Sequence, residues 1–369
     1  MEVKERIGEW FEHFHANPEV SLKEFKTTAK LVEILSGMGV EHKTFEDVTG
    51  VVAEIGEGDE IIAVRADIDA LWQEVGGVFK ANHSCGHDAN IAMVLGALTY
   101  LKTEDLGGRI RFIFQPAEEQ GNGAVSMIER GAVDGVSHLF GVHLRPIEEI
   151  PFGKITPAIH HGAAVFLEGK ITGVDAHGAR PHQGKNVIDP LFAINHFLKT
   201  IYFSPYEAYS VKLTKMQAGG DSVNIIPGSA TFALDARAQS NAVLNELMER
   251  ITEGILAVGQ MYGVEIKTEW TDYTPAAEVS KESVEIARTG ILETVGEEGL
   301  APAVITSGSD DFHFYTIHRP ELKATMIGIG ADLQPGLHHP DMTFNYEALD
   351  VGARVLAATL KKAILLNKK

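Results

Sequence analysis

The 369-residue sequence contains very little cysteine, and this scarcity excludes one class of protein. Its single cysteine, Cys85, cannot form a disulfide within the chain. Small secreted domains that depend on internal disulfides are therefore excluded, and a reducing compartment is expected.

Long hydrophobic runs are also missing. An apolar stretch such as residues 91–101 is about half the roughly 20 residues that a helix needs to span a bilayer. The N-terminal segment MEVKERIGEWFEHFHANPEV is amphipathic and charged, without the apolar stretch of a signal peptide. We therefore expect a cytoplasmic protein with no membrane partner.

Positive charge is scarce as well, with 32 Lys and Arg against 51 Asp and Glu and a net charge of −19. Such a surface repels phosphates, so nucleic acid is excluded as an expected partner. Hydrophobic residues make up 44% of the chain and charged residues 22%, a balance that allows a large buried core.

The order of apolar segments predicts an α/β protein of two domains, because the length exceeds what one core usually serves. We expect a layered domain with a mixed central sheet, formed by residues 1–163 and 274–369. Between these parts, strand and helix patterns alternate in the order βαββαβ. This order predicts an inserted domain at residues 164–273.

A dense polar cluster occurs at His83-Ser84-Cys85-Gly86-His87-Asp88. Cys85 and His87 are two positions apart, so both side chains can face one point, and thiolate and imidazole suit zinc and neighbouring metals. A buried cysteine next to a helix-capping Asp88 is the alternative interpretation. This segment alone leaves both open.

Two adjacent carboxylates, Glu118 and Glu119, follow the expected strand at 109–115. Carboxylates at the end of a buried strand need a cationic partner. In a metal enzyme, one glutamate can bind the ion while its neighbour transfers protons. Many such pairs lie in solvated acidic loops, so this pair alone is also open to two interpretations.

Two further histidines, His143 and His338, lie near a strand end and in a loop before the last helix. Each could be structural on its own. Together with Cys85, His87 and Glu119 they make five potential ligands at strand or loop ends, and ligands of open α/β sheets gather at the carboxyl edge of the strands. The combination predicts a metal site there.

Acidic residues also follow the expected strand at 61–66. A ligating imidazole usually donates its other N–H to a carboxylate, so Asp67 or Asp69 is a candidate to orient a ligand. In the inserted domain, His177 and Asn224 could donate hydrogen bonds to a developing oxyanion, and Arg237 could bind a carboxylate through two hydrogen bonds. An exposed loop and a surface arginine are the alternatives there.

In this order, the segments resemble the aminoacylase, hippurate hydrolase and auxin-conjugate hydrolase group of dinuclear metallopeptidase-like amidohydrolases. The motifs that carry the resemblance cover most of the chain: HFHANPEVSLKE, RADIDAL, HSCGHD, FQPAEEQGNGA, GVHLRP, VDAHGARPH, VNIIPGSA with a later DAR, SGSDDFHFY and GLHHPDMTFNYEAL. The resemblance implies a metal-dependent amidohydrolase that cleaves N-acyl amino acids or related conjugates. A dipeptidase or carboxypeptidase on the same scaffold is the alternative.

The resemblance also implies roles for particular residues. Two divalent ions (Zn, Mn, Co or Ni) would be bound by Cys85, His87, Glu119, His143 and His338. Glu118 would be the general base, and Asp67 would support the metal site.

The inserted domain would be a lid that binds substrate and mediates a homodimer. In it, His177 would stabilise the tetrahedral intermediate. Asn224 and Arg237 would contact the substrate, with Arg237 pairing with a carboxylate.

Three positions depart from the pattern of this group. Trp72 stands where many relatives have proline, Asn90 where many have histidine, and Asp310 where glutamate is more frequent. None of them removes an expected ligand. Trp72 and the unusual residues 73–78 leave the acyl group of the substrate undefined.

Two other classes of function fit these residues less well. A cysteine hydrolase with Cys85 as the nucleophile would leave the Glu118–Glu119 pair and His338 without a role, and chelators would not inhibit it. A metal-stabilised binding protein would not need Glu118.

Overall fold

A computed structural model describes residues 2–367, and the chain divides into two compact units. The first unit contains residues 2–160, 278–305 and 310–367, and the second contains His161–Ala277 and Thr306–Ser309. The expected inserted domain, 164–273, differs from the second unit by a few residues at each end and by the segment 306–309. The backbone N–H of Gly162 donates to the carbonyl oxygens of Thr306 (3.1 Å) and Gly308 (3.0 Å), which attaches this segment to the second unit.

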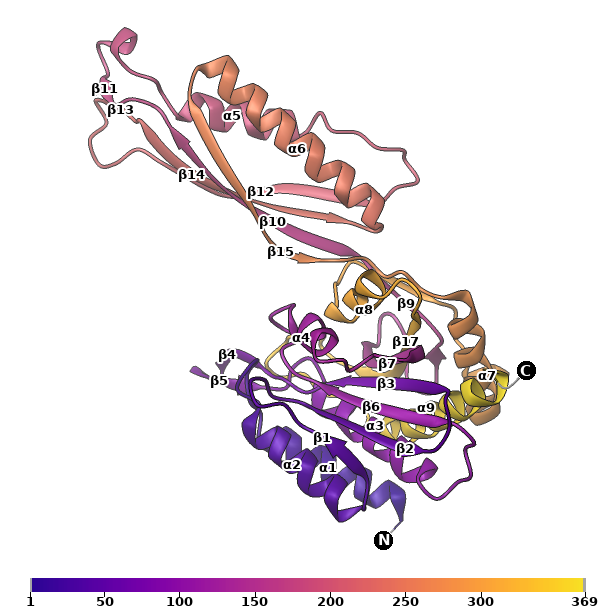
Figure 1. Ribbon diagram of the computed structural model, residues 1–369. Helices are drawn as coiled ribbons and strands as arrows, with labels where there is room; N and C mark the ends of the chain where they lie inside the picture. The colour runs from indigo at the N-terminus through magenta and orange to yellow at the C-terminus, as the bar shows by residue number, and fades with distance from the viewer. Residues whose placement is uncertain (1, 368–369) are drawn as a thin grey trace. The chain divides into compact units, whose positions relative to one another are not determined.

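The first unit is built on the mixed central sheet that the sequence predicts, and this sheet has seven strands (Figure 1). In spatial order the strands are β1 (Glu41–Lys43), β2 (Val51–Gly56), β6 (Arg109–Gln115), β3 (Ile61–Asp67), β7 (Val136–Pro146), β17 (Lys323–Leu333) and β8 (Ile155–Thr156). The four strands β6, β3, β7 and β17 are parallel, and the outer strands are antiparallel. All seven residues of β3 are buried, which explains why this strand is a continuous apolar run broken only by Arg65 and Asp67.

Helices cover both faces of this sheet. Helices α3 (His87–Leu101) and α9 (Glu347–Asn367) pack together on one face, and α4 (Gly123–Glu129) and α8 (Phe314–His318) lie on the other (Figure 1). The remaining helices of the unit are α1 (Val3–Ala16), α2 (Phe25–Gly37), α7 (Lys281–Gly299) and the short η2 (Asp311–His313). Almost every residue of α3 is buried, so its sequence is apolar on all sides. No helix within residues 2–367 is long and apolar enough to cross a membrane.

A hairpin that the sequence analysis did not predict precedes the His83–Asp88 segment. Its strands β4 (Leu71–Val75) and β5 (Val78–Asn82) pair with each other. Gly76 and Gly77 connect them with φ angles of 61° and 82°, the left-handed backbone that a tight two-residue hairpin turn requires. The Gly-Gly pair was the available signal.

The second unit has the predicted βαββαβ order. It consists of β10 (Ala163–Thr172), α5 (Ile188–Leu198), β12 (Tyr209–Ala218), β14 (Ser229–Ala238), α6 (Asn241–Tyr262) and β15 (Glu265–Thr274). The sheet is antiparallel with the spatial order β12-β14-β10-β15, and both helices lie on one face of it (Figure 1). Alternate residues of β14 are buried because only one face packs against the helices.

Short elements complete the fold. They are β9 (Ile159–His161), paired with β16 (Val304–Thr306), β11 (Ala176–His177), paired with β13 (Ile225–Ile226), and η1 (Pro181–Gln183).

The topology of the first unit brings four strand ends to one edge. Because β6, β3, β7 and β17 are parallel, their carboxyl ends point the same way. The chain places β6 on one side of β3 and β7 on the other, so the strand order reverses at β3. A crevice forms at such a reversal, outside the carboxyl ends, and this is where open α/β sheets bind ligands.

Candidate metal centre

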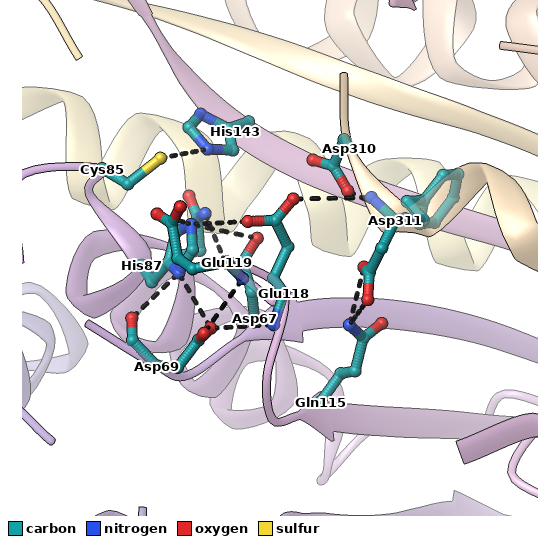
Figure 2. Close-up of polar contacts among 12 residues, drawn as sticks. Asp67, Asp69, Cys85, His87, Gln115, Glu118, Glu119, His143, Asp310 and Asp311 are labelled. Carbon is teal, nitrogen blue, oxygen red and sulfur yellow. Dashed lines mark hydrogen bonds and ion pairs between the residues drawn. The ribbon is translucent and has the colours of Figure 1, made fainter. Parts of the chain in front are cut away.

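Cys85, His87 and His143 meet at this edge of the sheet (Figure 2). One donor atom from each lies within 4.8 Å of the other two, and Cys85 Sγ is 3.6 Å from His143 Nε2. Gly86, between the first two, has a φ of 85° and directly precedes α3. A Cβ at Gly86 would approach Leu144 Cδ1 to 3.3 Å in addition to straining the backbone. The tight turn therefore brings Cys85 and His87 to the same point.

Glu118 and Glu119 extend into the same cluster from the loop after β6. Their side chains are only 11% and 10% exposed, and each has a carboxylate oxygen 3.8 Å from His87 Nε2. The two backbone N–H groups donate to the carboxylate of Asp69, at 3.1 and 3.0 Å. The pair therefore does not lie in a solvated loop, because Asp69 fixes its backbone and both side chains face inward.

His338 belongs to a loop that follows β17. Its Nε2 is 3.5 Å from Glu119 Oε1, and its side chain is 55% exposed. Donor atoms of His338, Glu119 and Cys85 form a second group within 4.8 Å of one another. The structure thus brings together all five residues that were expected to be metal ligands.

Backbone and carboxylate oxygens orient both buried imidazoles. His87 Nδ1 lies 2.9 Å from the backbone oxygen of Asp69 and 3.3 Å from its Oδ1, and His143 Nδ1 lies 2.7 Å from the oxygen of Leu144. The Nε2 atoms are therefore the ones available to the cluster. Of the two aspartates considered from the sequence, Asp69 contacts the outer nitrogen of His87.

Asp67 lies on the opposite side of the His87 ring. Its Oδ2 is 3.6 Å from His87 Nε2, within the cluster. Arg65 Nη1 donates to the same oxygen at 2.6 Å, and Asn90 Nδ2 donates to Oδ1 at 2.7 Å. Asn90, one of the positions that depart from the family pattern, thus holds Asp67 in place.

Burial shifts the protonation of these groups strongly. It raises the pKa of the Cys85 thiol and of Glu118, and it raises the pKa of Glu119 to about 7. Burial lowers the pKa of His143 to about 4. For His87, burial would lower the pKa, but the nearby Asp67 and Cys85 outweigh it and raise the pKa. A neutral Cys85 thiol beside the neutral imidazole of His143 does not favour a cysteine nucleophile activated by that histidine.

Two buried atoms show that the cluster fits a metal ion. Among the residues that the structure describes, neither His87 Nε2 nor Glu119 Oε1 has a hydrogen-bond partner. Both point into a set of sulfur, nitrogen and oxygen donors of the kind that binds divalent transition metals. A cation bound there would satisfy both atoms and would offset the cost of burying the thiolate and carboxylates.

An ion cluster beside Glu118 was not predicted. Arg65 is fully buried, and its Nη2 lies 2.7 Å from Asp311 Oδ1 and 3.3 Å from Asp310 Oδ1. Its Nε donates to Gln115 Oε1 at 2.9 Å. The backbone N–H of Asp311 in turn points to Glu118 Oε1 at 3.4 Å (Figure 2). An arginine that interrupts the apolar run of β3 was the signal in the sequence.

In the second unit, His177 and Asn224 lie close together. Strand β11, which contains His177, pairs with β13, and the N–H of Gly178 donates to the backbone oxygen of Asn224 at 2.7 Å. Both residues are exposed.

Arg237 lies at the other end of the same unit. It pairs in register with Ala164 at the start of β10, and its side chain forms an ion pair with Asp235 at 3.0 Å. Arg237 lies eight positions after Ser229 on β14, a distance of about 26 Å at the usual rise of a strand. His177 lies beyond the Ser229 end, so a single chain does not bring His177 and Arg237 to one small molecule.

The chain is similar to known proteins over most of its length. The model of a family described as Peptidase family M20/M25/M40 matches residues 63–362. The chain is 31% identical to an N-acetylcysteine deacetylase of Bacillus subtilis, with 93% of each chain covered. It is 29% identical to an IAA-amino acid hydrolase of Arabidopsis thaliana, over 95% of this chain and 84% of that protein.

Among solved structures, the chain is similar to the YXEP protein of Bacillus subtilis, described as a dinuclear metal binding peptidase from the M20 family. The TM-score is 0.84 and the identity 27%, with 98% of both chains covered. A family match over most of the chain, together with this shared fold, shows that the protein belongs to peptidase family M20/M25/M40.

Proposed function

We propose that the protein is a metal-dependent amidohydrolase that cleaves the amide bond of N-acyl amino acids or related conjugates. The observation that carries the proposal is the convergence of five ligand side chains with a sixth group, the Glu118 carboxylate, at the carboxyl edge of the sheet. The two named relatives, a deacetylase of an N-acetylated amino acid and a hydrolase of amino acid conjugates, support the substrate class.

The proposed metal site holds two divalent ions, with zinc, manganese, cobalt or nickel as candidates. The ligands are Cys85, His87, Glu119, His143 and His338. When bound, such ions polarise an amide carbonyl and lower the pKa of an attacking water.

Glu118 is the proposed general base. Its Oε1 lies 3.4 Å from the Asp311 N–H, and its Oε2 faces the cluster at 3.8 Å from His87 Nε2. Burial, with the charge of Asp310 added, raises the pKa of this carboxylate and so increases its affinity for a proton. Glu118 takes a proton from the attacking water and donates it to the nitrogen of the leaving amine.

In the second unit, His177 is proposed to stabilise the tetrahedral intermediate, and Asn224 and Arg237 to bind substrate. Because about 26 Å of β14 lies between Arg237 and the end near His177, we also propose a homodimer through this unit. In such a dimer, two chains would supply these side chains to one substrate. The single cysteine supports a cytoplasmic location.

Metal analysis and a substrate panel test the proposed function. Purified protein should contain close to two divalent ions per chain. It should hydrolyse N-acetyl or N-benzoyl amino acids faster than dipeptides, and chelation should abolish turnover until metal is restored. Activity that persists after complete metal removal would contradict the mechanism, and a preference for dipeptides would favour a peptidase.

Arg237→Ala should raise KM for substrates with a free carboxylate and leave kcat nearly unchanged, because it removes binding that substrate and transition state share. Amides that lack the carboxylate should not be affected. Arg354→Ala is the matched control, since Arg354 is an exposed arginine of α9 that also pairs with an aspartate, Asp350. Equal effects on both substrate types would disprove the carboxylate assignment.

A further inference from the structure

The side-chain amide of Gln73, on β4, connects three separate segments of the first unit. Its Oε1 accepts hydrogen bonds from Asn82 Nδ2, at 3.0 Å, and from the hydroxyl of Ser84. Its Nε2 donates to the backbone oxygen of His338 at 3.1 Å. The hairpin, the segment before Cys85 and the loop of His338 therefore meet at one half-buried amide.

The backbone of His338 is held from both sides by these segments. Its N–H donates to the oxygen of Ser84 at 2.7 Å, and its own oxygen accepts from Gln73. Asn82 Nδ2 also donates to the oxygen of Pro340, at 3.1 Å. Such fixation matters because His338 has a φ of 66°, an unfavourable conformation for a residue other than glycine.

Side-chain packing alone would not hold His338 in position without these backbone hydrogen bonds. The side chain is 55% exposed, whereas that of Glu119, its neighbour at 3.5 Å, is 10% exposed. Because more than half of the side chain is exposed, the position of the ring relative to Glu119 and Cys85 depends on where the backbone places the Cα atom. Gln73 is the side chain that fixes the backbone oxygen of His338.

We infer that Gln73 is a positioning residue for the metal site, which sets the position of His338 and thereby the affinity for one of the two ions. The inference rests on the proposed metal-dependent function. It also gives the unpredicted hairpin a role, since β4 and β5 supply Gln73 and Asn82. Loss of a hydrogen bond that orients a ligand typically lowers metal affinity by about 10- to 100-fold.

The Gln73→Glu variant distinguishes an effect on His338 from an effect on the hydrogen bonds with Asn82 and Ser84 alone. A glutamate oxygen can still accept from Asn82 and Ser84, but the carboxylate cannot donate to the His338 oxygen. Its added negative charge would by itself strengthen cation binding. Weaker binding would therefore report the lost hydrogen bond to His338 and not a change in charge.

The experiment titrates metal-free protein with Zn²⁺ against a chromophoric chelator and repeats the titration with Co²⁺, whose visible absorption reports coordination. Wild-type protein should bind two ions. Gln73→Glu should bind the first ion normally and the second about 10- to 100-fold more weakly, with a changed Co²⁺ spectrum only at the second equivalent. Gln260→Glu, at an exposed position of α6, is the matched control and should match the wild type.

The Gln73→Met variant is titrated in parallel, because methionine is similar in size to glutamine and adds no charge. Its affinity for the second ion also tests the inference if the glutamate variant does not fold. The methionine variant should show the same weaker second site. Two normal affinities in the uncharged Gln73→Met variant would overturn the inference while leaving the proposed function intact. Wild-type protein that binds no ion would overturn the proposed function itself, and the inference with it.

Discussion

Glu118→Gln should lower kcat by about 10²- to 10⁴-fold while the metal content stays at the wild-type level. Glutamine has the same shape, and its amide oxygen can still accept the Asp311 N–H that now points to Glu118 Oε1 at 3.4 Å. What it cannot do is take a proton from water at neutral pH. Steady-state kinetics on an N-acyl amino acid, combined with metal analysis of the same preparation, measures both quantities.

Glu119→Gln is the matched comparison, because the two glutamates are adjacent and equally buried. This second variant should lose bound metal as well as activity, since Glu119 faces both His87 and His338. If Glu118→Gln also loses an ion, Glu118 is a ligand and not the base. A fully active Glu118→Gln variant would remove this residue from the mechanism.

Arg65→Met should destabilise the first unit by about 3–5 kcal/mol. The substitution removes the guanidinium that Asp67, Asp310 and Asp311 share as a cationic partner and leaves these buried carboxylates to repel one another. Gln115 Oε1 also loses the Arg65 Nε donor and keeps the hydroxyl of Tyr315, at 3.1 Å. Urea unfolding of metal-free protein, followed by circular dichroism, should show a lower midpoint with an unchanged slope.

Two further variants identify the cause of the lower stability of Arg65→Met. Arg65→Lys keeps the charge but not the planar set of donors, so it should be destabilised less than the methionine variant. Arg250→Met removes an arginine of similar size from a surface ion pair with Glu246 and should change stability by less than about 1 kcal/mol. Equal loss in the Arg65 and Arg250 variants would show that the buried ion cluster contributes no more than a surface pair.

Features that depend on neighbouring positions could be predicted from the sequence. Buried strands such as β3 and β6 are short apolar runs, and the order of strands and helices along the second unit follows from its periodicity. The convergence of Cys85, Glu119 and His143 could also be predicted, because parallel strands end at a common edge. The assignment of each as a ligand stays a prediction.

Features that depend on pairing across the chain could not be predicted. Arg65 and Asp311 are 246 positions apart, and nothing in either segment indicates which buried arginine and aspartate pair. Asp67 and Asp69 are two positions apart on one segment. Which of them faces Nδ1 of His87 could only be determined from the backbone geometry. The separation of Arg237 from His177 likewise required the register of β10 with β14.

The segment 306–309 limits how the second unit can be exchanged between proteins, in the laboratory or in evolution. Its carbonyl oxygens are held by the N–H of Gly162, and it leads by one peptide bond into Asp310, a member of the buried ion cluster. Deleting only residues 161–277 would therefore remove Gly162, and the segment 306–309 that precedes Asp310 would lose these hydrogen bonds. The second unit cannot be exchanged as one continuous segment. A chimera between family members would have to include both His161–Ala277 and Thr306–Ser309.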